Sequence, residues 1–424
     1  MTEPSRFPVW HPFTQHALAP PPIAIARTDG AFLETADGRR ILDAVSSWWV
    51  VTHGHRHPRI TAAIHEAAER YDQIIFAGFT HEPAEQLARR LLALAPRSLQ
   101  HVFFSDSGST AVEVAIKMAL GHWRNLGQPR HRIAVLEHGY HGDTIGTMSA
   151  GARGVFNRTY EPLLYDVVRL PFPSPGREDA TLTALGNACR NDKLAALLVE
   201  PLVLGAGGML MYDPNVLAAM RGICHGHDVL LIADEVMTGF GRTGRVWACS
   251  HGGIQPDILC LAKGLTGGAL PLAATLTTAP IFASHFSTDR SRTLYHSSSY
   301  TANPIACAAA LANLDVWETE PVRDRLAALA DAQTAHLARF RADARFENVR
   351  QCGTIAALDV KVPDAGYLAG IGPKIYDHCL ARDVLLRPLG NTIYVMPPYC
   401  TTAADLDRVY AAIASAADAV VGRA

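Results

Sequence analysis

The chain has 424 residues, enough for two domains around a large core, and its 38 Lys and Arg nearly balance its 40 Asp and Glu. This balance, without a basic stripe, argues against nucleic-acid binding, and no apolar run approaches the ~20 residues of a membrane-spanning helix. The eight cysteines form no Cys-x-x-Cys pair, which is typical of reduced thiols in a cytosolic protein. Residues 1–6 lack the pattern of a secretion signal, so we expect a cytoplasmic protein.

The first predicted elements are short strands near residues 31–34 and 40–42, and this N-terminal segment should pack with the C-terminal part of the chain. A strand at 101–104 and an amphipathic helix follow. The apolar side chains of that helix recur at helical spacing from Val112 to Trp123. The stretch from Thr110 to Glu113 is typical of a capping box at its start.

The middle of the chain alternates apolar runs with helical patterns. The further predicted strands lie at 132–136, 194–199, 229–233, 258–262 and 272–277. Runs that are apolar throughout are typical of strands buried on both faces. Their alternation with helices predicts an α/β fold with a mainly parallel central sheet.

After about residue 320 the pattern changes. A helix is predicted at 323–341, followed by shorter strands at 355–360, 384–387 and 392–396. This pattern indicates a smaller α+β domain. We therefore expect a large domain at 53–320 and a small domain formed by both termini, at 1–52 and 321–424.

Lys263 follows a predicted strand and precedes glycines, which is an unusual place for a charge. A buried ammonium is costly unless it is neutralised or chemically engaged. A buried lysine of lowered pKa is the group that forms Schiff bases with carbonyl cofactors. Asp234, at the end of a separate apolar run, could hold a protonated pyridine nitrogen. A pyridoxal phosphate enzyme needs this pairing of lysine and aspartate.

Two segments rich in small polar residues could bind a phosphate. Residues 103–110 lead from a strand into a helix, whose N–H groups attract anions. Ser297, Ser298 and Ser299 precede a helix predicted at 305–314 and could close such a site. A plain serine-glycine turn and a plain polar loop are the alternatives.

Three further residues stand at predicted strand ends. Tyr140, between glycines, could cover the face of a flat cofactor. Glu200 could order an arginine or touch the substituents of a cofactor ring. Arg387 could hold a substrate carboxylate. Glu200 and Arg387 could also be ordinary surface residues.

Other motifs point elsewhere. His138 with His141, and the histidines within 53–57, suggest a metal only weakly because no supporting ligand spacing accompanies them, so no metal is expected. Residues 239–244 spell Gly-x-Gly-x-x-Gly, which would suit a nicotinamide-dependent oxidoreductase. That fingerprint requires a strand running directly into the glycines and a helix leaving them, and residues 235–238 intervene.

Taken in chain order, these segments resemble the class III pyridoxal-phosphate aminotransferases of fold type I, from about residue 10 to 399. Asp234-Glu235, the glycines at 239–244 and Lys263 carry the resemblance. Within the family, residues 10–14, 46–49 and 396–399, with Arg387-Pro388, resemble members that pass the amino group of S-adenosylmethionine to 8-amino-7-oxononanoate in biotin synthesis. A relative that uses ω-amines or diamines would keep every cofactor residue.

The resemblance also implies roles for individual residues. Lys263 would bind pyridoxal phosphate covalently and move protons, and Asp234 would contact the pyridine. The other cofactor-binding positions would be Gly108, Ser109, Tyr140, Glu200, Ser298 and Ser299, the last reaching the phosphate from the partner subunit of a homodimer with shared active sites. The substrates would meet Phe13, Trp48, Tyr140, Lys263, Ser297 and Arg387. Phe13 stands where the family often has tyrosine.

Overall fold

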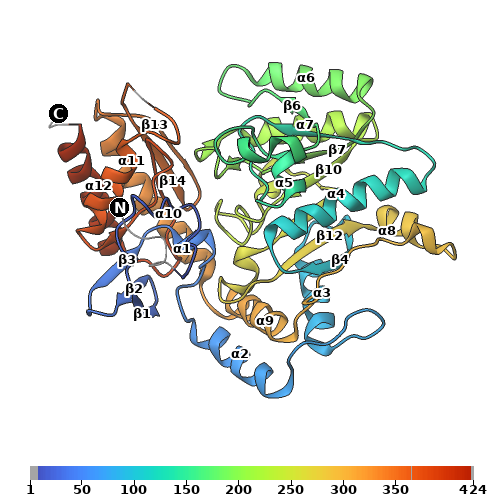
Figure 1. Ribbon diagram of the computed structural model, residues 1–424, viewed down its shortest axis with the longest axis horizontal. Coiled ribbons are helices and arrows are strands. Elements are labelled where there is room, and N and C mark those ends of the chain that lie inside the picture. The colour runs from blue at the N-terminus through green and yellow to red at the C-terminus, as the bar shows by residue number, and fades with distance from the viewer. Residues whose placement is uncertain (1–7, 364, 422–424) are drawn as a thin grey trace.

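The computed structural model describes residues 8–363 and 365–421, so residues 1–6, in which no secretion signal is predicted, lie outside the described residues. Figure 1 shows a large sheet covered by helices, beside a second group of elements that both ends of the chain build together. No helix within the described part of the chain is long and apolar enough to cross a membrane.

A seven-stranded sheet forms the larger part of the molecule, and the predicted mainly parallel sheet is confirmed. Only β12 runs antiparallel to its neighbours. In spatial order the strands are β4 (Leu99–Ser105), β12 (Ala273–Thr278), β11 (Ile258–Leu261), β10 (Leu230–Asp234), β7 (Leu194–Val199), β5 (Arg132–Leu136) and β6 (Val168–Leu170). Every residue of β7 is buried, as its unbroken apolar run predicts.

Helices pack on both faces of this sheet (Figure 1). Those that contact its strands are α3 (Glu82–Leu94), α4 (Gly108–Asn125), α6 (Glu178–Asn191), α7 (Pro214–Gly226) and α8 (Ala279–His285). Helix α5 (Ile145–Ala150) packs on α4, and α2 (Pro58–Arg70) packs on α9 (Pro304–Thr319), which also contacts α3. A short hairpin of β8 (Val203–Leu204) and β9 (Leu210–Met211) leaves the carboxyl end of β7.

The predicted capping box of α4 is wrong by one turn. Ser107 is the N-cap, and it forms the box with Thr110. The reason is that β4 ends at Ser105, so the chain enters the helix almost at once. Glu113 instead accepts a hydrogen bond from the Thr144 hydroxyl at 2.6 Å.

Both ends of the chain meet in one small sheet, as predicted. Its strand order is β1 (Ile25–Asp29), β2 (Phe32–Thr35), β3 (Arg40–Asp43) and β15 (Val384–Leu385), with β3 parallel to β15. Strand β15 is shorter than the predicted 384–387, because Pro388 has no N–H to donate and restricts the residue before it. The domain boundaries themselves stay a prediction.

A second small sheet joins β13 (Phe346–Cys352), β14 (Ile355–Val360) and β16 (Thr392–Val395). It packs with α10 (Val322–Arg341), while α11 (Ile371–Leu380) and α12 (Ala403–Val420) pack on each other. The helical turn α1 (Ser46–Trp49) follows β3 directly. The carboxyl ends of β4, β5, β7, β10 and β11 share one edge of the large sheet, which is where ligands bind in open α/β sheets.

Candidate active site

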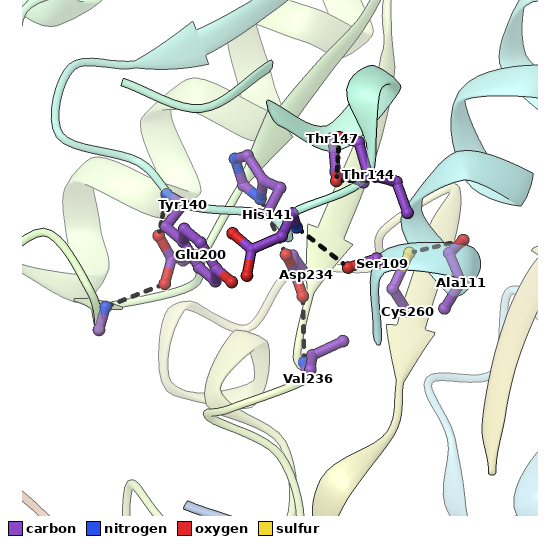
Figure 2. A network of polar contacts seen from close by, with 12 residues as sticks. Ser109, Ala111, Tyr140, His141, Thr144, Thr147, Glu200, Asp234, Val236 and Cys260 are labelled. Atoms are coloured by element: carbon purple, nitrogen blue, oxygen red, sulfur yellow. Dashed lines mark hydrogen bonds and ion pairs between the residues drawn. The ribbon is translucent and has the colours of Figure 1, made fainter. Parts of the chain in front are cut away.

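A cavity of about 390 Å³ lies at this carboxyl edge, within the usual range for small-molecule sites. Most of the residues predicted to bind the cofactor line it: Gly108, Ser109, Tyr140, Glu200, Asp234 and Lys263. They come from the ends of different strands and from the start of α4. Figure 2 shows several of them converging around Asp234.

Asp234, the last residue of β10, is buried with 5% of its surface exposed. Its Oδ2 lies 2.8 Å from His141 Nδ1, and its Oδ1 accepts a hydrogen bond from the Val236 N–H at 3.1 Å (Figure 2). Sequence reasoning considered His141 only as a weak metal ligand and missed this contact. Two partners therefore fix the orientation of a buried carboxylate that faces the cavity.

Lys263 begins a short 3-10 turn (Lys263–Thr266) directly beyond β11. Its φ of 43° lies in the left-handed region, which is uncommon for a lysine and marks local strain. Burial lowers the pKa of Lys263 to about 8, although Asp234 and Glu200 oppose the shift. A substantial fraction of this amine is therefore neutral near physiological pH, as a nucleophile or base requires.

The end of the cavity at α4 suits an anion. A Cβ on Gly108 would come within 2.6 Å of Val236 Cγ1, so this position requires glycine to keep its space. Gly142 has a φ of 132°, and a Cβ there would come within 2.1 Å of Ser109 Oγ. Two glycines thus leave room beside the first N–H groups of an 18-residue helix.

Glu200 closes another side of the cavity. Its two carboxylate oxygens accept hydrogen bonds from the backbone N–H groups of Tyr140 and Gly205, each at 2.9 Å. Burial raises the pKa of Glu200 to about 7. Of the alternatives that the sequence left open, the structure shows no hydrogen bond or ion pair between Glu200 and an arginine in the described residues. Its contact with Tyr140 instead fixes the backbone of the residue that was predicted to cover the cofactor.

A second cavity, of about 120 Å³, adjoins the first. It is lined by the predicted substrate residues Phe13, Trp48, Tyr140, Lys263 and Arg387, and also by Trp49, Phe156, Tyr367 and Tyr394. Tyr140, Lys263 and Trp49 line both cavities, so the lysine stands at their junction.

The Arg387 guanidinium is unpaired within this smaller cavity. Its carbon lies 4.3 Å from the centroid of the Trp48 ring and 5.9 Å from that of Phe13. Among residues 8–363 and 365–421, no hydrogen bond or ion pair to this guanidinium is present. A cation held by aromatic rings without a carboxylate partner is suited to bind a ligand carboxylate.

The three serines lie outside both cavities. Ser298 donates a hydrogen bond to Asp106 at 2.6 Å, and Asp106 lines the larger cavity. Ser297 and Ser299 are exposed. Within one chain, the structure does not bring Ser297 or Ser299 to the site, so their predicted roles stay predictions.

The glycine-rich segment at 239–244 is a loop that leads into no α-helix. Arg242, fully buried within it, donates hydrogen bonds to the carbonyls of Val51 at 2.7 Å and Pro397 at 2.9 Å. The loop therefore ties distant segments together, and the structural context of a dinucleotide fingerprint is missing. In the described part of the chain, no three His, Cys, Asp or Glu side chains gather as metal ligands would.

Comparisons with known proteins agree with this geometry. The family model for class-III aminotransferases matches residues 13–417. An adenosylmethionine-8-amino-7-oxononanoate aminotransferase of Synechococcus elongatus is 47% identical, over 98% of this chain and all of the relative. The crystal structure of the Methanocaldococcus jannaschii protein of that name is 32% identical with a TM-score of 0.91, covering 96% of both chains. A PLP-bound amine transaminase from an uncultivated Pseudomonas species is 33% identical with a TM-score of 0.90, covering 97% of this chain and 99% of its own.

Proposed function

Because the chain belongs to the class-III aminotransferase family, whose cofactor is pyridoxal phosphate, we propose that it transfers the amino group of S-adenosylmethionine to 8-amino-7-oxononanoate in biotin biosynthesis. The relatives from Synechococcus elongatus and Methanocaldococcus jannaschii carry the name of that activity. The observation that supports it most is the Arg387 guanidinium, which lies against Trp48 in the cavity that Lys263 also lines and has no ion-pair partner among the described residues.

The larger cavity fits pyridoxal phosphate. The first turn of α4, with Gly108 and Ser109, would hold the phosphate, and Asp234 would hold the protonated pyridine nitrogen. Lys263 would supply the amine that binds the aldehyde of the cofactor. When bound, the cofactor supplies the carbonyl carbon that accepts the amino group and a ring that withdraws electrons from the bond that breaks.

Lys263 is the residue of this chain that would transfer the proton. Its lowered pKa would let the side-chain amine take up a proton from the donor's α-carbon and deliver it to the cofactor's carbonyl carbon. His141 and the Val236 N–H hold the Asp234 carboxylate in place, where it would contact the ring nitrogen of the cofactor. Tyr140 lines both cavities and would cover the cofactor while it touches the substrate.

The smaller cavity would receive both substrates in turn. Arg387 would hold the carboxylate of the donor or of the acceptor. Phe13 and Trp48, with ring centroids 5.7 Å apart, offer apolar faces to an adenosyl ring or to a pimeloyl-derived chain. Phe13 has no hydroxyl, so it can contribute only packing.

We further propose that the protein acts in the cytoplasm as a homodimer with shared active sites. Ser299 is exposed and lines neither cavity of its own chain, which supports a role in the partner's site. Ser298 would then act in the active site of its own chain, through its hydrogen bond to Asp106.

Half-reactions without an acceptor test the donor. S-adenosylmethionine should discharge the absorbance of the lysine-bound cofactor, whereas lysine, alanine and simple diamines should leave it unchanged. Conversion only by simple amines would favour the alternative, a broad ω-amine or diamine aminotransferase. That alternative also has a structural neighbour, the amine transaminase described above.

A further inference from the structure

The turn that carries the two tryptophans is strained. Within α1, Ser46, Ser47 and Trp49 all have positive φ, at 53°, 57° and 64°. Ser47 combines its φ with a ψ of −100°, a conformation that favours glycine. Residues held in such conformations persist only where their surroundings over-determine them, and they cluster at functional sites.

Asp43 supplies that restraint. It is completely buried at the end of β3, and its Oδ1 accepts a hydrogen bond from the Val45 N–H at 3.2 Å. Its Oδ2 accepts from the Ser47 N–H at 2.6 Å and from the Ser47 hydroxyl at 3.1 Å. His55 Nε2 lies 2.9 Å from the same oxygen. One carboxylate therefore holds the strained residue through both its backbone and its side chain.

The same restraint connects to Arg387. Asp43 pairs with Leu385 across the parallel β3–β15 contact, two residues before Arg387. The strand pair that places the arginine thus also places the carboxylate that holds the tryptophan turn.

The turn determines where both tryptophans lie. Trp48 faces the smaller cavity against Arg387 and Phe13. Trp49 lies between the cavities, with its Nε1 donating to the Tyr394 hydroxyl at 2.9 Å and its ring centroid 4.7 Å from Lys263 Nζ. A relaxed turn would move the aromatic wall relative to both charged groups.

We propose that Asp43, supported by His55, is a positioning residue for substrate recognition: it holds the strained turn at Ser46–Trp49 so that Trp48 and Trp49 form the wall between Lys263 and Arg387. The identity of the substrates rests on the proposed function. The restraint of the turn by Asp43 does not depend on it. A carboxylate that merely stabilised the small sheet would leave substrate affinity unchanged.

Asp43→Asn tests the proposal with an almost isosteric change, because the carboxamide retains only one acceptor oxygen. Hydrogen exchange followed by mass spectrometry should show amides 45–50 of the cofactor-free protein exchanging at least about tenfold faster. With whichever amino donor the wild type uses, KM should rise about 10-fold to 100-fold, and more than kcat falls. Bound-cofactor absorbance should persist.

Asp383→Asn is the matched control. Asp383 stands just before β15 and binds Arg39, just before β3, at 2.7 Å, and neither residue has a hydrogen bond to the turn in the described structure. This variant should leave both the exchange of amides 45–50 and KM as in the wild type. Equal effects from the two variants, or unchanged exchange or KM in Asp43→Asn, would overturn the proposal.

Ser47 provides a second test if Asp43→Asn does not fold. Ser47→Ala removes the hydroxyl and keeps the strain, while Ser47→Gly removes the hydroxyl and relieves the strain. KM should therefore rise more in Ser47→Ala than in Ser47→Gly, and the reverse order contradicts the proposal. If the wild type refuses S-adenosylmethionine but accepts another donor, the proposed function fails while these comparisons still decide the role of Asp43.

Discussion

Replacing Arg387 with alanine should reduce the use of carboxylate-bearing substrates selectively. The guanidinium has no protein anion to leave behind in the described structure, so its removal strands no buried charge. The free protein loses its contact with Trp48, which contributes about 0.5–1 kcal/mol. Fold and cofactor absorbance should therefore survive.

The cost to catalysis follows from the pair that a substrate carboxylate would form. Truncating one partner of a desolvated charge pair costs roughly 2–5 kcal/mol, and the partial exposure of Arg387 places this case at about 2–3 kcal/mol. At 1.4 kcal/mol per factor of ten, kcat/KM should fall about 30-fold to 150-fold. Arg387→Lys should lose less activity than Arg387→Ala, because lysine keeps the positive charge. It should still fall below the wild type, because lysine lacks the planar guanidinium.

The assay compares 8-amino-7-oxononanoate with its methyl ester, which lacks the negative charge. Arg387→Ala should lose the stated factor with the free acid and little with the ester. Arg382→Ala, an exposed arginine whose guanidinium donates to the His378 carbonyl at 3.0 Å, is the control and should behave as wild type. Equal losses of Arg387→Ala on acid and ester would refute the carboxylate role.

Further predictions concern the larger cavity and the dimer. Burial lowers the pKa of Lys263 to about 8, so the rate at which cofactor-free protein binds pyridoxal phosphate covalently should rise with pH and level off above that value. A midpoint of this pH dependence near the ordinary lysine pKa would show that the amine is not buried. Asp234→Asn should lower kcat by about 10²–10⁴-fold without preventing cofactor binding, as absorbance and single-turnover rates would show, and near-normal turnover would remove Asp234 from the mechanism. Mixed dimers of Lys263→Ala and Ser299→Trp should recover roughly a quarter of wild-type activity, since half of the dimers hold one intact site; verified heterodimers without activity would mean that each chain builds its own site.

The buried strands and the central residues of the site could be predicted from sequence. Strand β7 is apolar throughout and lies inside the sheet, so its pattern matched its environment. Asp234 and Lys263 stand at the ends of apolar runs, and parallel strands bring such ends to one edge. These inferences needed only local pattern and general topology.

The contacts between distant segments could not be predicted. His141 and Asp234 are 93 residues apart, and a histidine beside glycines has many possible partners. Glu200 binds two N–H groups, one from the loop after β5 and one from the hairpin that follows β7. The strain at Ser47 and its restraint by Asp43 leave no trace in composition or periodicity. Such features depend on the assembled backbone.

The most direct test of the central claim is product formation by the purified protein. With S-adenosylmethionine and 8-amino-7-oxononanoate, mass spectrometry should detect 7,8-diaminononanoate, and Lys263→Ala should abolish it. Product formed only with lysine, alanine or a simple diamine as donor, or no product with any donor from a protein that holds its cofactor, would contradict the account.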